Sequence, residues 1–182
     1  MSRLQQKYRK EVIPAMKEKF GYRNDLAVPR IEKVVVNSGI GRVQNDQKAR
    51  EEIAKDLALI TGQKPAVRRA KKAIAAFKTR KGMIVGLMTT LRGERMYDFL
   101  ERLISIALPR GRDFRGLKKE SIDKNGNLTI GIKEKIIFPE ISAESAKSIF
   151  GLEVCVKTTA KTKEEGRELL KLMGFPISSA SR

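Results

Sequence analysis

The sequence predicts an α+β fold, in which a mainly antiparallel sheet has helices packed on one face and a long basic loop between strands. Segments in which apolar residues alternate with polar ones are interleaved with segments of helical period, and Gly, Pro or Asn-Gly turns separate them. The chain has 182 residues and no internal repeat or low-complexity linker. We therefore expect residues 1–182 to form a single domain, with a basic loop at about 64–82 and a loose tail at 177–182.

The first helix and the first strand are expected near the N-terminus. Apolar side chains recur at helical spacing from residue 3 to residue 20, where Gly21 ends the pattern. Pro14 predicts a kink or an interruption of this helix. Residues 30–37 contain a β-branched run, which predicts a strand that closes at the glycines following it.

The second helix and the second strand flank the most basic part of the chain. Asn45 or Asp46 is the expected N-cap of a helix that ends at Gly62. Residues 83–92 alternate as in a strand with one buried face. One face of this strand has Val85, Leu87 and Leu91, and the other has Gly86, Met88, Thr90 and Arg92. If the apolar face is the core, Thr90 and Arg92 point outward.

The remaining elements follow the same alternation of periods. Residues 94–107 have helical spacing, and Pro109 terminates the pattern. Strands are expected at 127–133, after an Asn-Gly turn, and at 152–158, with a further short strand at 136–138. Thr162 and Glu165 form a capping box that predicts a last helix ending at Gly174.

The charge of the chain indicates a polyanionic partner. Lys and Arg number 39 against 21 acids, which gives a formal charge of +18 and a pI of about 10.2. No acid occurs between Leu57 and Gly93, and the stretch from Lys64 to Lys81 has eight cations. A solvated helix face is the ordinary explanation of a charge run. The absence of acids and the excess of cations over the whole chain favour phosphate binding instead.

The composition argues against an enzyme. The chain has no His and a single cysteine, Cys155, so the usual zinc-ligand sets and the commonest general base are missing. The paired glycines at 39 and 41 and at 82 and 86 match neither a P-loop nor a full dinucleotide fingerprint. No stretch approaches the roughly 20 apolar residues of a membrane span. We expect no cofactor, no metal and no membrane partner.

Several segments together resemble the bacterial large-subunit ribosomal protein family that carries 5S rRNA, fifth in the conventional large-subunit naming. The resemblance runs nearly end to end. The segments that carry it are Phe20-Gly21-Tyr22, Val28-Pro29-Arg30-Ile31-Glu32-Lys33, Leu57-Ala58-Leu59-Ile60-Thr61-Gly62-Gln63-Lys64-Pro65, Arg80-Lys81-Gly82-Met83, Thr90-Leu91-Arg92-Gly93-Glu94-Arg95-Met96, Arg112-Asp113-Phe114-Arg115-Gly116-Leu117, Ile137-Phe138-Pro139-Glu140-Ile141 and Thr158-Thr159-Ala160-Lys161-Thr162.

The resemblance implies a structural role in the large ribosomal subunit, in three parts. The sheet face would bind 5S rRNA and help to anchor it in the central protuberance, through Asn37, Gln63, Thr90 and Arg92. The basic loop would contact P-site tRNA through Lys71, Lys72, Lys78, Arg80 and Lys81. A bridge to a small-subunit head protein would involve Arg110, Arg112, Asp113, Phe114 and Arg115. Further implied partners are 23S rRNA and other central-protuberance proteins.

The implied location is a cytoplasmic ribosome, with an organellar ribosome as an open alternative. The chain departs from the family pattern at Ala73–Ala76, where Ser and Asn are common, and at Gly111, where an apolar residue is usual. The turn at 123–128 also lacks the family's usual aromatic residue. Two rival functions stay open at this point: an RNA-processing enzyme that uses carboxylates and Mg²⁺, and a general RNA chaperone whose affinity follows charge and salt.

Overall fold

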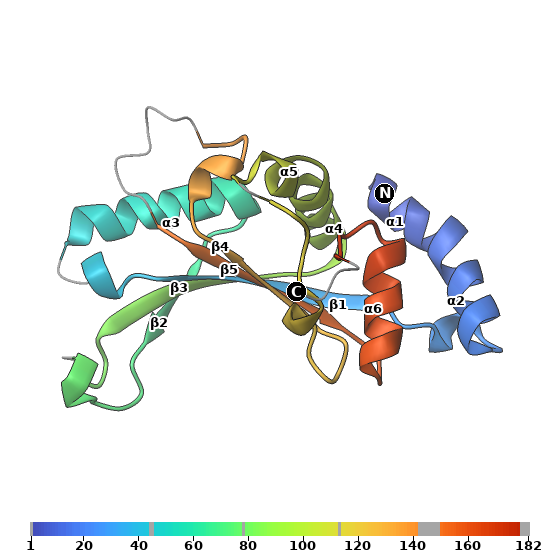
Figure 1. Cartoon of the computed structure of the whole chain (residues 1–182). Helices are drawn as coiled ribbons and strands as arrows, with labels where there is room; N and C mark the ends of the chain where they lie inside the picture. The colour runs from blue at the N-terminus through green and yellow to red at the C-terminus, as the bar shows by residue number, and fades with distance from the viewer. Residues whose placement is uncertain (1, 44–45, 78, 113, 142–149, 179–182) are drawn as a thin grey trace. The chain divides into compact units, whose positions relative to one another are not determined.

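The computed structural model describes every residue except 1, 44–45, 78, 113, 142–149 and 179–182 (Figure 1). Its fold is α+β, with a five-stranded antiparallel sheet of strand order β2-β3-β1-β5-β4, which confirms the predicted class. The strands are β1 Ile31–Gly39, β2 Ala66–Arg69, β3 Ile84–Leu91, β4 Leu128–Ile132 and β5 Leu152–Thr158. The α-helices are α1 Arg3–Lys7, α2 Ile13–Phe20, α3 Gln47–Thr61, α4 Gly93–Arg102, α5 Leu108–Arg110 and α6 Lys163–Leu172.

The described residues form two compact units. Unit 1 comprises Met1–Val34, Arg92–Ile130 and Cys155–Arg182, and unit 2 comprises Val35–Leu91 and Gly131–Val154. That the whole chain behaves as a single domain stays a prediction.

Two π-helical turns in unit 1 follow from the positions of two prolines. The first turn, Tyr8–Val12, joins α1 to α2 just before Pro14, and the second, Leu103–Ala107, joins α4 to α5 just before Pro109. A proline has no N–H to donate, and its ring clashes with the carbonyl four residues earlier. A widened turn before the ring relieves this clash. The predicted interruption at Pro14 is thus confirmed. The predicted end of the helix of 94–107 at Pro109 is wrong, because α5 continues through this proline to Arg110.

The core of unit 1 includes a buried tyrosine. The Tyr8 hydroxyl donates to the Pro29 carbonyl at 3.1 Å, and Tyr8 and Tyr97 both keep less than a tenth of their surface exposed. Burial, together with the nearby Tyr97, raises the pKa of Tyr8 from 10.0 to about 12, although Arg30 opposes the rise. The folded chain therefore holds this proton more tightly than the unfolded chain does.

Alkaline pH is expected to destabilise unit 1 through Tyr8. The stabilisation that comes from the raised pKa is complete below pH 10 and is lost as the pH rises toward about 12. In Tyr8→Phe this proton is absent, so the urea midpoint should fall less between pH 9 and pH 11 than it does in the unsubstituted chain. Equal falls in the two proteins would contradict the assignment.

Unit 2 is built on the predicted helix and its caps. Helix α3 begins after Asp46, whose carboxylate accepts from the Ala49 N–H at 3.1 Å, and ends at Gly62, whose φ of 67° is left-handed. Ile53, Leu57 and Ile60 are buried, and α3 packs against β3. These caps confirm the bounds that the sequence predicts.

A buried ion pair connects α3 to the segment after β4. Lys135 is fully buried and forms a hydrogen-bonded ion pair with Asp56 of α3. The Lys135 ammonium also lies 4.9 Å from the centre of the Phe150 ring. The segment around Lys135 forms a 3-10 turn, Lys135–Ile137, so the predicted short strand at 136–138 is wrong. The Phe138 N–H donates to the Lys135 carbonyl at 3.1 Å, which closes this turn in place of a bond to a neighbouring strand.

Candidate nucleic-acid interface

One face of the strands in unit 2 brings several predicted residues together. Leu87 and Leu91 of β3 are buried, so the predicted alternation holds, and Met88 and Thr90 lie on the opposite face. The register of β2 with β3 pairs Arg68 with Gly86 and Ala66 with Met88. The Arg68 guanidinium lies 3.5 Å from the Met88 sulfur. This open face therefore presents Arg68 together with the predicted Thr90.

Asn37 of β1 lies on the same open face. A Cβ atom built on Gly86 would lie 3.7 Å from the Asn37 Oδ1 atom and 4.0 Å from the Arg68 Cβ atom. It would also lie 3.2 Å from the Ser38 carbonyl oxygen, so a larger residue at 86 would disturb β1. Gly86 thus leaves the backbone uncovered between the Asn37 amide and the Arg68 side chain.

Gln63 is fixed to the end of β3. Its Nε2 atom donates to the Thr90 carbonyl at 3.3 Å. The Thr61 hydroxyl, 2.7 Å from the Leu57 carbonyl, closes the end of α3 just before it. Three of the four residues predicted to bind 5S rRNA, Asn37, Gln63 and Thr90, are therefore held in unit 2.

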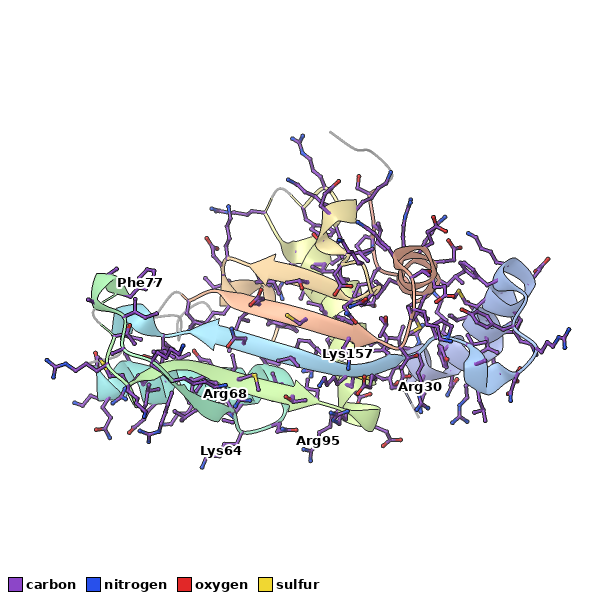
Figure 2. The ribbon with its side chains drawn as sticks, turned by 90° about the horizontal axis from the view of Figure 1, so that it is seen from below. Arg30, Lys64, Arg68, Phe77, Arg95 and Lys157 are labelled. Atoms are coloured by element: carbon purple, nitrogen blue, oxygen red, sulfur yellow. The ribbon has the colours of Figure 1, made fainter. Side chains whose placement is uncertain are left out.

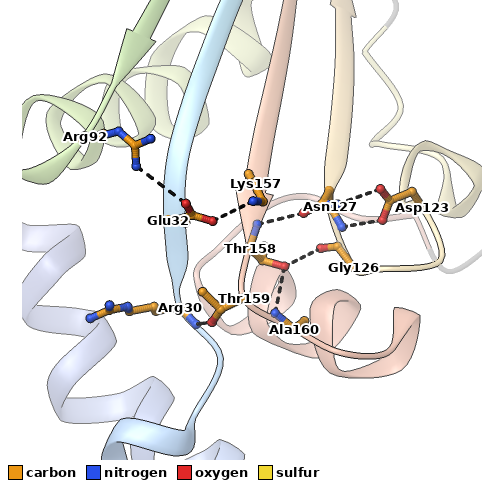
Figure 3. Close-up of polar contacts among 10 residues, drawn as sticks. All are labelled: Arg30, Glu32, Arg92, Asp123, Gly126, Asn127, Lys157, Thr158, Thr159 and Ala160. Atoms are coloured by element: carbon orange, nitrogen blue, oxygen red, sulfur yellow. Dashed lines mark hydrogen bonds and ion pairs between the residues drawn. The ribbon is translucent and has the colours of Figure 1, made fainter.

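The fourth, Arg92, lies in unit 1 in a group of alternating charges (Figure 3). Glu32 lies between two cations, with its Oε1 atom 3.7 Å from Arg92 and its Oε2 atom 3.0 Å from the Lys157 ammonium. The hydrogen bond from Lys157 holds the pKa of Glu32 below its usual value. Both cations are half exposed, so phosphates can compete for them.

The turn before β4 is held by hydrogen bonds to Asp123 and Asn127. The Asp123 carboxylate accepts from the N–H groups of Asn125 and Asn127 at 2.9 and 2.8 Å. The Asn127 side-chain oxygen in turn accepts from the Thr158 N–H at 3.0 Å (Figure 3). The turn is therefore tied to β5 within unit 1.

Much of the predicted basic loop is an ordered hairpin. Strands β2 and β3 pair directly, and the connection Ala70–Met83, called here the hairpin tip, continues the ladder. Ala70 and Met83 bond at 2.8 Å, Ile74 and Thr79 form an isolated bridge, and Ala75–Phe77 make a 3-10 turn. The predicted cations Lys71, Lys72, Arg80 and Lys81 are exposed there, and Lys78 lies outside the described residues.

The predicted bridge segment lies in unit 1. Arg110, Arg112 and Arg115 are exposed and Phe114 is half-buried, while Asp113 lies outside the described residues. The structure explains why position 111 is a glycine, because a Cβ atom there would lie 3.1 Å from the Leu108 carbonyl oxygen. The family departure at this position therefore matches the tight end of α5.

Sequence reasoning missed exposed cations in unit 1. Lys157 and Arg30 of unit 1 are labelled in Figure 2, and the sequence pattern identifies neither as a binding residue, whereas Arg68 of unit 2 is one of the eight cations between Lys64 and Lys81. The alternation of 152–158 could have identified Lys157 as an outward residue. The position of Arg68 on the open face could not be predicted, because it depends on strand β2, whose four residues are all exposed and show no alternation of burial.

Two features were not found among the described residues. Among them, no group of three or more His, Cys, Asp or Glu side chains is placed to hold a metal ion. In the same part of the chain, no helix is both long and apolar enough to cross a membrane.

The sequence matches one family over most of its length. Residues 24–80 match the family described as Ribosomal protein L5, and residues 84–177 match the C-terminal part of the same ribosomal family. The large ribosomal subunit protein uL5 of Rubrobacter xylanophilus is 55% identical over 97% of this chain and 98% of its own length. The protein of the same name from Thermoanaerobacter sp. is 52% identical over 98% of this chain and 99% of its own. The chain therefore belongs to the uL5 family of large ribosomal subunit proteins, which are structural and not enzymatic.

Proposed function

We propose that this ribosomal protein binds 5S rRNA through the open face of its strands. The observation that carries the proposal is the polar surface of unit 2, where Asn37, Thr90 and Arg68 lie on the face opposite the buried Leu87 and Leu91. An RNA helix exposes 2′-hydroxyls and base edges in a shallow minor groove, and a flat surface with amide and hydroxyl groups suits it. Cations beside such groups bind phosphates and fix the register of the RNA.

The hairpin tip is proposed to contact tRNA in the P site. It has exposed cations on both arms, and no acid occurs from Leu57 to Gly93. Clustered cations repel one another, and phosphates both relieve this repulsion and release counterions. The backbone bonds of the tip hold these charges at the end of a defined hairpin, so they can reach a second RNA.

The third proposed contact is a bridge to a small-subunit head protein. Arg110, Arg112 and Arg115 give the bridge segment a positive surface, and the half-buried Phe114 lies between the last two in the sequence. Such a segment suits an acidic partner surface. Contacts with 23S rRNA and with other proteins of the central protuberance complete the proposed set of partners.

Substitutions should separate the two RNA contacts. Lys71→Ala with Arg80→Ala is expected to lower tRNA occupancy of reconstituted large subunits several-fold, because two phosphate contacts are lost. The same variant should leave 5S rRNA affinity nearly unchanged. Thr90→Ala with Arg92→Ala should show the reverse pattern, with 5S rRNA affinity about 30-fold lower, since each of the two lost contacts contributes about 1 kcal/mol.

The control is Lys48→Ala, which removes an exposed cation from α3 and should change neither binding reaction. Filter binding to 5S rRNA and to an unrelated structured RNA, over a salt series, gives the affinities. Equal and steeply salt-dependent binding to both RNAs would leave a general RNA chaperone and contradict the proposed 5S rRNA site.

A further inference from the structure

The hairpin tip exposes an aromatic side chain that the cations do not explain. Phe77 is 73% exposed, and within the described part of the chain it is the only aromatic residue that is exposed and not buried or half-buried. Figure 2 shows Phe77 at the far end of the hairpin. Ile74, which also lies in the hairpin tip, has an aliphatic side chain that is 48% exposed. Two large apolar groups thus lie in water at the end of the most basic hairpin of the chain.

The backbone of Phe77 is held on both sides. Its N–H donates to the Ile74 carbonyl at 3.2 Å, and its carbonyl accepts from the Thr79 hydroxyl at 3.1 Å. Ile74 and Thr79 exchange two backbone hydrogen bonds, of 2.9 and 3.1 Å, across the base of the turn. These bonds fix the backbone of Phe77, so binding through its side chain loses little backbone conformational entropy.

The surroundings of Phe77 identify the chemistry of its partner. The two arms that lead to Phe77 expose Lys71 and Lys72 on one side and Arg80 and Lys81 on the other, so the partner is negatively charged. The partner must also offer an apolar, flat surface to the ring, which phosphates do not. A nucleobase next to its own phosphate supplies both features, and aromatic side chains stack on every base.

We propose that Phe77 stacks on an exposed base of the tRNA that the hairpin tip contacts, with Ile74 packing beside it. This inference rests on the tRNA contact proposed above and adds to it a base contact that does not depend on charge. The lysines and arginines attract the tRNA, and the ring determines which part of the tRNA meets the tip. An anionic membrane surface could also meet cations and an aromatic ring, and the test includes it.

Because the sequence has no tryptophan, a tryptophan introduced at position 77 is a specific fluorescent probe of the contact. Phe77→Trp places a single Trp in the complex of the full chain with 5S rRNA. Addition of tRNA should quench its fluorescence, because stacking on a base quenches indole emission, whereas 5S rRNA alone should leave the emission unchanged. Phe77→Ala and Phe77→Leu should lower the affinity of the complex for tRNA about 10-fold, since Leu keeps the apolar volume and loses the flat ring.

Salt dependence separates stacking from charge. Phe77→Ala should leave the slope of log affinity against log salt unchanged, whereas Lys71→Ala should reduce it by somewhat less than one unit. The control is Leu59→Ala on α3, which removes another exposed apolar side chain, 59% exposed, and should not change tRNA affinity.

The outcomes distinguish the two proposals. If the unsubstituted complex does not bind tRNA, the proposed tRNA contact is wrong and the stacking falls with it. If the complex binds tRNA but Phe77→Ala binds equally well, or tRNA at saturation leaves the Trp emission unchanged, the stacking alone is overturned. Quenching by 5S rRNA alone, or a Trp blue shift on anionic lipid vesicles but not on tRNA, would also overturn it.

Discussion

Asp56→Ala is expected to lower the free energy of unfolding by about 3–5 kcal/mol, which is a large fraction of the stability of a typical domain. The substitution leaves the Lys135 ammonium in the interior of unit 2 without its carboxylate. Lys135 is fully buried, and the nearby Phe150 ring offers only a weak attraction to a cation. Because an unpaired buried charge has lost its hydration, the penalty exceeds the loss of an ordinary hydrogen bond. Urea unfolding of the chain measures the change.

A double substitution separates the cost of an unpaired charge from the value of the pair. Asp56→Leu with Lys135→Met fills the same space without charge, and its stability should lie within about 1 kcal/mol of the unsubstituted chain or above it. Glu51→Ala removes an exposed acid from the same helix and should change stability by less than about 0.5 kcal/mol. If Asp56→Ala behaves like Glu51→Ala, the ion pair contributes nothing and its burial needs another explanation.

The elements that the sequence predicts correctly are those with local signals. Asp46, Gly62 and Thr162 occupy the caps that their residue types favour, and the observed helices begin and end beside them. Strand 152–158 has the expected bounds, because apolar and polar residues alternate along it without interruption. Such features depend on neighbours a few residues away, so one sequence contains the information.

The features that escaped prediction depend on residues far apart in the chain. The pair of Asp56 with Lys135 spans 79 positions, and neither residue carries a local sign that it will be buried. Strand β2 forms because β3 pairs with it, although its own residues show no alternation. The candidate interface shows the same contrast. Alternation within one strand predicts that Thr90 faces outward, whereas the position of Arg68 beside Gly86 depends on the register between β2 and β3.

The last large effect concerns a contact between two glycines in unit 1. Gly166 lies inside α6, and Gly126 lies in the turn before β4. A Cβ atom on Gly166 would lie 2.2 Å from the Gly126 Cα atom and 2.5 Å from its carbonyl oxygen. Both atoms belong to the backbone, and the Gly126 carbonyl also accepts from the buried Thr158 hydroxyl at 3.0 Å. The turn therefore cannot withdraw without losing that bond.

Gly166→Ala should accordingly destabilise the chain by about 3 kcal/mol, at the upper end of the usual cost of overpacking. The sign of this change in stability tests the contact, because Gly→Ala inside a helix normally stabilises by about 1 kcal/mol. Gly131→Ala is the matched control: a Cβ atom there meets nothing within 4 Å, so this variant should be as stable as the unsubstituted chain or slightly more stable. Thermal and urea unfolding of the two variants should move in opposite directions or differ by several kilocalories per mole. If Gly166→Ala instead gains stability, the helix and the turn do not touch in solution, and helix propensity alone governs this position.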